Sequence, residues 1–176
     1  MISIEIKARC TDLLRIRKIL KARRARFKGL DRQVDTYFRV PSGRLKLREG
    51  NIENALIYYE RADRKSSKLC KAVLFKCPDP ASLKRILSAA ARVLAVVDKK
   101  REIYFIKNAK FHIDRVKKIG NFVEIEVFGL TRDLGKLKEQ CEFYRRLFGI
   151  RSRDLAADSY SDQLVRLQTR DRSLKR

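Results

Sequence analysis

Charged side chains recur at alternating positions in several short segments of this chain. Side chains at positions i and i+2 of a strand project from the same face, so each segment would present a charged face. The sets are Glu5, Lys7 and Arg9; Arg44, Lys46 and Arg48; Lys99 and Arg101; His112 and Asp114; and Glu124 and Glu126, with Arg61 ending a further segment. Arginine and lysine bind phosphate oxygens, whereas carboxylates hold Mg²⁺ or Mn²⁺. Brought together, these residues would bind a phosphate compound and a divalent metal.

Two arrangements of these charged faces have to be weighed. An antiparallel sheet commonly keeps one face in water, and for any single strand that is the simpler interpretation. The recurrence of fully charged positions of both signs favours a sheet that closes into a barrel, with the charged faces lining its lumen. Eight strands are enough for a barrel that encloses a small ligand. A lumen with so many charges is costly unless opposite charges or a ligand pair them.

The hydrophobic pattern supplies eight candidate strands and three long helices. Alternating or β-branched runs predict strands over residues 2–9, 33–40, 44–48, 56–62, 71–76, 99–106, 110–116 and 122–128. Apolar residues at helical spacing predict a helix over 13–28 that has a basic outer face, a second from Asp79-Pro80 to Leu94, and a third from Thr131 to Gly149. A short helix is expected near 159–164.

These elements predict the fold class and the domain organisation. We expect an α+β fold in which an eight-stranded antiparallel sheet forms a closed barrel and the helices pack outside it. The chain shows no internal repeat and no linker, so we expect a single domain over residues 1–168. The charged segment over 169–176 is expected to be a disordered tail.

Composition restricts the class of protein and of partner. The 176 residues carry 44 Lys and Arg against 21 Asp and Glu, for a formal net charge of +23, and 44% of them are hydrophobic. A charge of this size indicates a polyanionic partner: nucleic acid, an acidic lipid or a small phosphate compound. No apolar run approaches the roughly 18 residues of a membrane span, and charged residues interrupt the N-terminus where a secretory signal would lie. We therefore expect a soluble, cytoplasmic protein with no membrane partner.

The cysteines and the histidine argue against a zinc site. Cys10, Cys70, Cys77 and Cys141 are scattered without a Cys-x-x-Cys pair, and His112 is the single histidine of the sequence. Zinc sites use closer ligand spacings. We expect four reduced thiols, as is usual for a protein of a reducing, intracellular compartment.

Several motifs resemble those of one known family. Glu5-Ile6-Lys7-Ala8-Arg9 resembles the Glu-x-Glu-x-Lys signature of the CYTH proteins, the triphosphate tunnel metalloenzymes. The later blocks follow in family order over residues 2–164: Gln33 to Phe38, Gly43 to Glu49, Lys99 to Phe105, Asp114 to Glu126, and Ser159 to Asp162. Within the family, the chain is most similar to the branch that contains the class IV adenylyl cyclases.

The resemblance implies an eight-stranded tunnel that binds a triphosphate together with Mg²⁺ or Mn²⁺. It makes Glu5 and Glu124 metal ligands, assisted by Glu126. Asp114 and Lys99 are the catalytic candidates, Asp114 by helping with the metal or by positioning the nucleophile. The residues implied to grip phosphates, besides Lys99, are Lys7, Arg9, Lys46, Arg48, Arg61 and Arg101.

One position departs from the family signature. Ser3 stands where the first Glu of Glu-x-Glu-x-Lys would be. A serine hydroxyl binds Mg²⁺ weakly, as it does in P-loops, and brings no negative charge. We therefore expect weaker metal binding with some activity retained through the remaining carboxylates.

Two reactions fit such a tunnel, and hydrolysis ranks first. In hydrolysis of ATP, tripolyphosphate or another triphosphate, water attacks the terminal phosphorus. In cyclisation, the ribose 3′-hydroxyl of ATP attacks the α-phosphorus, giving cyclic AMP and pyrophosphate. Both reactions need in-line geometry and neutralised phosphate oxygens. The sequence offers no residue that would recognise adenine. Hydrolysis is therefore the preferred interpretation, and adenylyl cyclase activity is the alternative.

The sequence is also compatible with functions that involve no catalysis. Ser3 is compatible with a module that binds a polyphosphate or nucleotide without turnover. The basic face of the first helix is compatible with nonspecific contact with nucleic acid, since such surfaces bind phosphate backbones. His112 is expected to be a hydrogen-bonding residue of the lumen, with proton transfer as the alternative. Either a monomer or a homodimer would satisfy the sequence.

Overall fold

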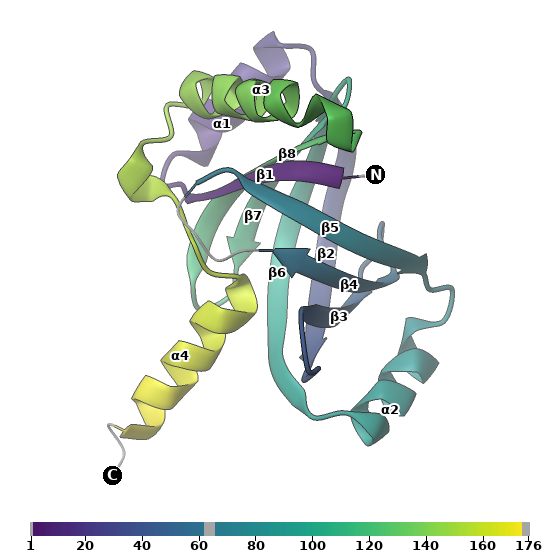
Figure 1. The fold of residues 1–176 in the computed structure, drawn as a ribbon. Coiled ribbons are helices and arrows are strands. Elements are labelled where there is room, and N and C mark those ends of the chain that lie inside the picture. Colours follow the sequence, from purple (N-terminus) through teal and green to yellow (C-terminus); the bar gives the residue numbers. More distant parts are fainter. Residues whose placement is uncertain (1, 62–65, 174–176) are drawn as a thin grey trace.

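The chain forms a closed barrel of eight antiparallel strands (Figure 1). The structure, a computed structural model, describes residues 2–61 and 66–173, with the side chains of Arg61, Asp171 and Arg172 left out. The strands follow the ring order β1-β5-β4-β3-β2-β6-β7-β8, and β8 pairs with β1 to close it. The expected fold class is confirmed. The strands are β1 Ile2–Arg9, β2 Arg26–Phe38, β3 Arg44–Glu49, β4 Ala55–Arg61, β5 Lys68–Lys76, β6 Val93–Ile106, β7 Ala109–Val116 and β8 Gly120–Gly129.

The two longest strands begin earlier than the sequence pattern predicts. β2 starts at Arg26 rather than at residue 33, and β6 starts at Val93 rather than at residue 99. The two strands pair with each other from Arg26 opposite Phe105 to Phe38 opposite Val93. The apolar run after the second helix, including Leu94, therefore belongs to a strand, because its partner on β2 supplies hydrogen bonds along its whole length.

The first helix is shorter than predicted. α1 spans Leu13–Ala22, and the side chain of Asp12 caps its N-terminus by accepting from the backbone of Arg15 at 2.9 Å. The helix ends because Arg24 adopts a left-handed conformation with φ of 52°, and the amide of Ala25 then donates to the Leu20 carbonyl at 2.9 Å. Residues 26–28 lie in β2, so the predicted helix over 13–28 is wrong in its last six residues.

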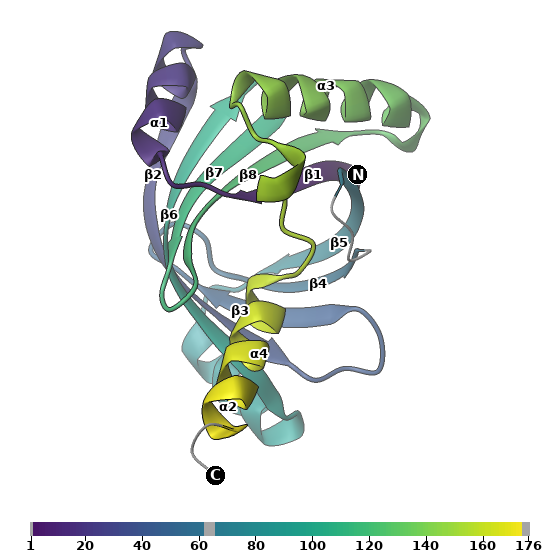
Figure 2. The ribbon, with the colours of Figure 1, turned by 90° about the vertical axis from the view of Figure 1, so that its left-hand side faces the viewer.

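Helices cover the outside of the barrel on two sides. α1 and α3 (Leu134–Leu147) lie on one side (Figures 1 and 2), over the outer faces of β1, β7 and β8. Their contact surface is the larger apolar core, in which Ile4, Phe111 and Ile125 are fully buried. α2 (Pro80–Ala90) lies at the other end of the barrel and packs Leu83 and Leu87 beside a smaller core. Ile86, which stands three residues after Leu83, is 64% exposed.

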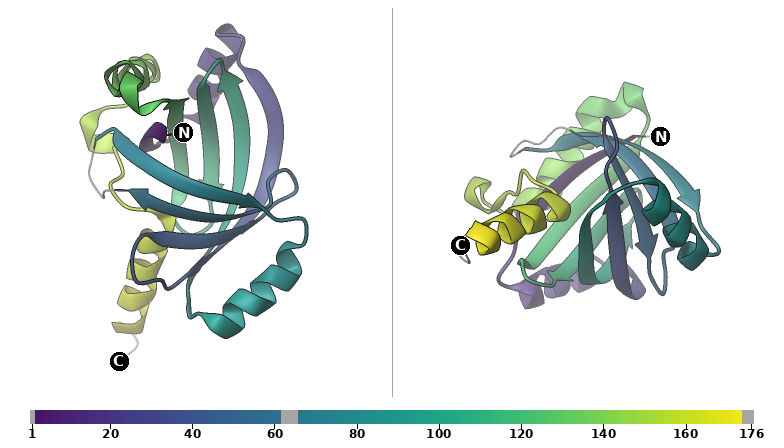
Figure 3. Two further views of the ribbon diagram at one scale, coloured as in Figure 1. Left: turned by 45° about the vertical axis from the view of Figure 1, so that its right-hand side comes forward. Right: turned by 90° about the horizontal axis from the view of Figure 1, so that it is seen from below.

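The C-terminal helix begins at one end of the barrel and extends away from it. α4 spans Tyr160–Ser173, so residues 169–173 continue a helix where a disordered tail was expected, and 174–176 lie outside the described residues. Ser159 and Asp162 cap the helix reciprocally, each side chain accepting from the other's backbone amide. Figure 2 shows the start of α4 in front of the barrel opening, and Figure 3 shows how far it extends away from the strands.

Two further sequence expectations can be compared with the structure. No helix among the described residues is long and apolar enough to cross a membrane. All four cysteines are thiols, and Cys70, Cys77 and Cys141 are buried.

Candidate functional site

The barrel encloses a cavity of about 880 Å³ lined by charged residues of both signs. Of the described residues that line it, eight are Lys or Arg and five are Asp or Glu, so cations exceed carboxylates by three. The cations are Lys7, Lys28, Lys46, Arg48, Lys76, Lys99, Arg101 and Lys110, and the carboxylates are Glu5, Asp35, Glu53, Glu124 and Glu126. The charged strand faces thus converge on one enclosed space, as the barrel interpretation requires.

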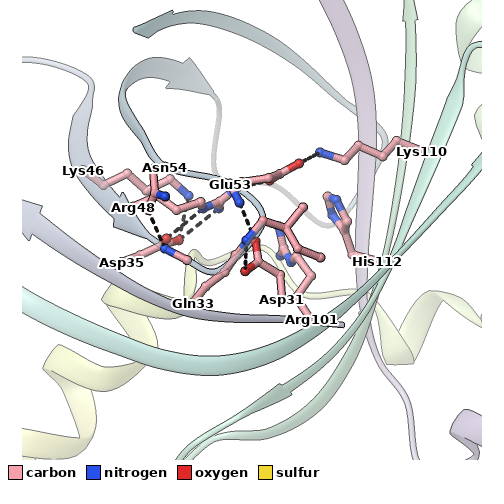
Figure 4. A network of polar contacts seen from close by, with 12 residues as sticks. Asp31, Gln33, Asp35, Lys46, Arg48, Glu53, Asn54, Arg101, Lys110 and His112 are labelled. Atoms are coloured by element: carbon pink, nitrogen blue, oxygen red, sulfur yellow. Dashed lines mark hydrogen bonds and ion pairs between the residues drawn. The ribbon is translucent and has the colours of Figure 1, made fainter. Parts of the chain in front are cut away.

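Asp35 of β2 is the centre of one group of cations (Figure 4). Its carboxylate contacts Arg48 at 2.9 Å, Lys46 at 3.0 Å and Lys99 at 2.6 Å, and it is 1% exposed. Burial alone would raise the pKa of Asp35, but attraction to Arg48, Lys46 and Lys99 holds that pKa well below its usual range. Asp35 therefore stays ionised and fixes three basic side chains in the lumen.

Lys99 is the most perturbed base of this group. Its side chain is fully buried, and burial, together with repulsion from Arg48 and Arg101, lowers its pKa to about 7 despite the attraction of Asp35. At neutral pH the charged and the neutral amine of Lys99 are therefore present in comparable amounts.

Glu124 of β8 is the centre of a second group. Its carboxylate contacts Lys7 at 3.1 Å and Arg101 at 2.6 Å. Arg101 also donates to Asp114, by Nε at 2.7 Å, and the hydroxyl of Tyr160 donates to Asp114 at 2.7 Å. Asp114 is 0% exposed and does not line the cavity. Asp114 therefore lies behind Arg101, where it orients the guanidinium.

His112 belongs to the same group and is neutral. Its Nδ1 lies 3.2 Å from a Glu124 oxygen, and burial and the charge of Arg101 lower its pKa to about 3. A neutral ring beside a carboxylate donates from Nδ1, which leaves Nε2 as an acceptor. Nε2 is buried and has no hydrogen-bond partner among the described residues. The expected hydrogen-bonding role thus holds for Nδ1, while Nε2 keeps a lone pair.

A loop that the sequence patterns did not mark adds Glu53 to the lumen. The carboxylate of Asp31 accepts the backbone amides of Ile52 at 2.9 Å and Glu53 at 3.0 Å, which pins the β3–β4 loop onto β2. Gly50 belongs to this turn, since a Cβ there would lie 2.6 Å from the Asp31 carboxylate. Glu53 then contacts Arg48 at 3.0 Å and Lys110 at 2.9 Å (Figure 4). Attraction to Lys110 and Arg48 outweighs burial and lowers the pKa of Glu53.

Comparison with known proteins decides the family. The CYTH domain matches residues 1–160 of the chain. The chain belongs to the CYTH family. No curated protein matches the chain.

Solved structures of several organisms resemble this CYTH protein. PH1012 protein from Pyrococcus horikoshii OT3 has a TM-score of 0.80 at 28% identity, over 91% of this chain and 98% of that chain. A candidate adenylate cyclase from Vibrio parahaemolyticus has a TM-score of 0.75 at 17% identity, over 93% and 98%. HpAC1 from Hippeastrum, a candidate adenylyl cyclase described as having a dominant triphosphatase activity, has a TM-score of 0.62 at 14% identity, over 94% and 96%. The family resemblance of the sequence is thereby confirmed.

CYTH proteins generally use divalent metals, and the lumen of this one offers oxygen ligands for such an ion. Glu5 and Glu126 lie directly opposite each other on β1 and β8, and Ser3 Oγ donates to Glu126 at 3.2 Å. Burial and the charge of Glu5 raise the pKa of Glu126 to about 7. No cluster of three or more Asp, Glu, His or Cys close enough for a metal occurs among the described residues. Two carboxylates nevertheless fit Mg²⁺, which commonly takes one or two from the protein and its other ligands from water and phosphate.

The structure brings most of the expected site residues into this CYTH tunnel, but not all. Arg9 is exposed, does not line the cavity, and donates to the Ile119 carbonyl and to Gln163. The side chain of Arg61 lies outside the described residues. The residues that line the cavity or order it and that sequence patterns missed are Lys28, Asp31, Asp35, Glu53, Lys76, Lys110 and Tyr160.

Proposed function

We propose that this CYTH protein is a metal-dependent phosphohydrolase that removes the terminal phosphate of a triphosphate bound in the lumen. The observation that supports this most strongly is the excess of three cations over carboxylates among the described residues that line the barrel cavity. Arg and Lys side chains bind the oxygens of a phosphate chain through strong, charge-assisted hydrogen bonds. The description of HpAC1 as having dominant triphosphatase activity supports hydrolysis over cyclisation.

The two ion-pair groups would hold the phosphates. Lys46, Arg48 and Lys99 are fixed by Asp35, while Lys7 and Arg101 are fixed by Glu124. Because the carboxylates hold these bases in place before substrate arrives, little reorganisation is needed when charge develops on the phosphate. In this proposal Asp114 is a positioning residue that acts through Arg101.

We propose that Lys99 accepts the proton that the reaction releases. A water oxygen forms a bond to the terminal phosphorus while the bond from that phosphorus to the bridging oxygen breaks, and the electron pair leaves with the shortened chain. The attacking water loses a proton. Lys99, whose pKa is lowered to about 7, can accept that proton as a neutral amine.

Glu5 and Glu126 would hold the divalent ion, with the hydroxyl of Ser3 beside them. Bound there, Mg²⁺ or Mn²⁺ supplies positive charge that neutralises phosphate oxygens. Glu124, expected as a ligand, already contacts Lys7, Arg101 and His112. We therefore propose that Glu124 orders the phosphate-binding bases, with Glu126 taking the larger part in metal binding.

Product analysis tests the proposal. Purified protein is incubated with ATP or tripolyphosphate and Mg²⁺ or Mn²⁺, and the products are separated. We expect ADP or diphosphate together with inorganic phosphate. Arg101→Gln should lower the rate by about 10²–10³-fold, the usual loss for a group that stabilises transition-state charge. Lys100→Gln, at the adjacent exposed position, should keep the wild-type rate.

Two other results would contradict hydrolysis. Cyclic AMP and pyrophosphate from ATP would make the protein a cyclase. Saturable binding of tripolyphosphate without turnover in any metal would make it a binding module, with Ser3 as the first residue to examine.

A further inference from the structure

The lining of the lumen is divided between charged and apolar strands. The described side chains that β4 and β5 direct into the cavity are apolar or aromatic, apart from Lys76 at the end of β5. We call this surface the β4–β5 wall; it consists of Ala55, Ile57, Tyr59, Cys70, Ala72 and Leu74. The charged residues described above come mainly from the other six strands and the β3–β4 loop. The cavity therefore has a charged side, to which Tyr37 and Phe128 also contribute, and an apolar side formed by the β4–β5 wall.

The wall adjoins the proposed phosphate site directly. Lys46 Nζ, which lies 3.0 Å from Asp35, also lies 5.6 Å from the centroid of the Tyr59 ring. A phosphate bound by Lys46 would thus sit next to the first aromatic residue of the wall. A group attached to that phosphate would continue along Ile57 and Leu74, which pair across β4 and β5.

Part of the wall is open to solvent. β1 pairs with β5 only from Ser3 opposite Cys70 to Glu5 opposite Lys68, so residues 71–76 have β4 as their strand partner. Leu74 lines the cavity and yet is 58% exposed. An apolar surface left in water inside a cavity is typical of a ligand-binding wall.

The size of the cavity agrees with a ligand larger than a phosphate chain. Its volume of about 880 Å³ lies in the upper part of the range that holds whole organic ligands. Bare tripolyphosphate would occupy the charged side and leave the β4–β5 wall hydrated. An apolar group on the wall would gain binding free energy from removing that surface from water.

We propose that the preferred substrate is an organic triphosphate ester whose apolar body packs against the β4–β5 wall. The inference rests on the proposed function, since it assumes that the charged side of the lumen holds the phosphates. It names the class of substrate: a triphosphate monoester of an uncharged, largely apolar alcohol, in preference to inorganic tripolyphosphate.

A graded series of ligands tests this assignment. The probes are tripolyphosphate, methyl triphosphate and hexyl triphosphate, each with methylene groups in place of the bridging oxygens so that binding is measured without turnover. Dissociation constants are determined by calorimetry in Mn²⁺. We expect affinity to rise along the series, by about fourfold for each methylene that the wall buries.

Two variants of neighbouring residues locate the apolar body. Leu74→Ser should reduce the ratio of hexyl to methyl affinity, because it removes apolar surface from the wall. Val73→Ser is the matched control: Val73 is 70% exposed and does not line the cavity, so the ratio should stay at the wild-type value.

The outcomes separate this inference from the function on which it rests. Equal affinity for all three probes would overturn the proposal that the β4–β5 wall binds the apolar body. It would not contradict triphosphate binding in the lumen. A rise along the series that Leu74→Ser does not change would place the apolar body elsewhere and also overturn it. If none of the three probes binds, the proposed function fails together with the inference.

Discussion

At the scale of single residues, the carboxylate of Asp35 is the most consequential group in the lumen. It forms ion pairs with Lys46, Arg48 and Lys99, and Asp35 itself is buried. Removing one partner of a buried ion pair leaves charge without compensation, which is far more costly than losing a surface pair.

Asp35→Asn should therefore destabilise the protein strongly. We expect a loss of about 3–5 kcal/mol in the free energy of unfolding, measured with urea. Asp98→Asn, which removes an exposed carboxylate 3.7 Å from Lys117, should change that free energy by less than about 0.5 kcal/mol. Equal stability of the two variants would show that the ion pairs of Asp35 do not stabilise the fold.

The lowered pKa of Lys99 predicts how the stability of the protein depends on pH. Its pKa in the folded protein is lowered to about 7, below that of an unfolded lysine, so between pH 7 and about 10 the unfolded chain binds more protons than the folded one. Stability contributed through Lys99 should then rise with pH across this window, by at most about 1.4 kcal/mol per pH unit.

Lys99→Met removes that dependence, and the comparison is made by urea unfolding at several pH values. The difference in unfolding free energy between wild type and Lys99→Met should grow in favour of wild type from pH 7 upward. The unfolding free energy of Lys100→Met, a change at an exposed position, should depend on pH as that of wild type does. A constant difference between wild type and Lys99→Met would show that Lys99 keeps an ordinary pKa.

The side chain at position 3 is expected to affect the affinity for the metal. Its hydroxyl lies 3.2 Å from Glu126, at the edge of the oxygen ligands formed by Glu5 and Glu126. Ser3→Glu should tighten Mn²⁺ binding on the order of tenfold, because affinity of such sites follows the number of charged ligands. Calorimetric titration measures it, with Ser3→Gln as the uncharged control. Unchanged affinity would mean that position 3 is not a ligand here.

At the scale of elements, α4 is fixed to the barrel mainly by its first turn. Tyr160 is 3% exposed, its hydroxyl donates to Asp114, and its ring contacts Phe122 at 4.9 Å between centroids. Arg44 adds a contact to Asp162 at 3.0 Å. Beyond the first turn, Leu164 is buried in the same core, and most of the other described side chains of the helix are exposed.

Tyr160→Ala should release α4 from the end of the barrel. Loss of a buried aromatic side chain costs about 3–5 kcal/mol, and here that cost falls on one peripheral helix. Hydrogen exchange over residues 160–173 should become much faster, with little change in β7 and β8. Val165→Ala, on the exposed side of α4, is the control. Unchanged exchange in Tyr160→Ala would show that other contacts hold the helix.

Elements also show which features the sequence could predict. The period-two alternation of Ser3 to Arg9 and of Phe122 to Phe128 identified charged lumen faces, with Arg9 as the exception, because both strands bury their other face under helices. The end of α1 was missed because an arginine, Arg24, takes the left-handed position that glycine usually fills.

The rest of the site depends on contacts between segments far apart in the sequence. Asp31 and Asp35 lie in a stretch where charged and apolar residues do not alternate cleanly, so their places in the site follow only from pairing with β3 and β6. Glu53 lies in a loop and reaches the lumen through the amides that Asp31 binds. Ile57 and Leu74 read as ordinary strand residues, since both faces of β4 and β5 carry apolar side chains.

At the scale of the whole molecule, the net charge of +23 is divided between lumen and surface. α1 exposes Arg15, Lys18 and Lys21 on the side of the barrel that α3 also covers. We expect weak, sequence-independent RNA binding whose affinity falls steeply with salt, measured by fluorescence anisotropy. Binding that is specific for one sequence, or insensitive to salt, would contradict this account of the surface.

The central claim is that the charged strand faces form one triphosphate-binding lumen. A crystal structure with a methylene-bridged triphosphate and Mn²⁺ tests it most directly. We predict phosphate oxygens within hydrogen-bond distance of Arg48, Lys99 and Arg101, and an ion beside Glu5 and Glu126. An empty lumen at saturating ligand, or phosphates bound only on the outer surface, would contradict the claim.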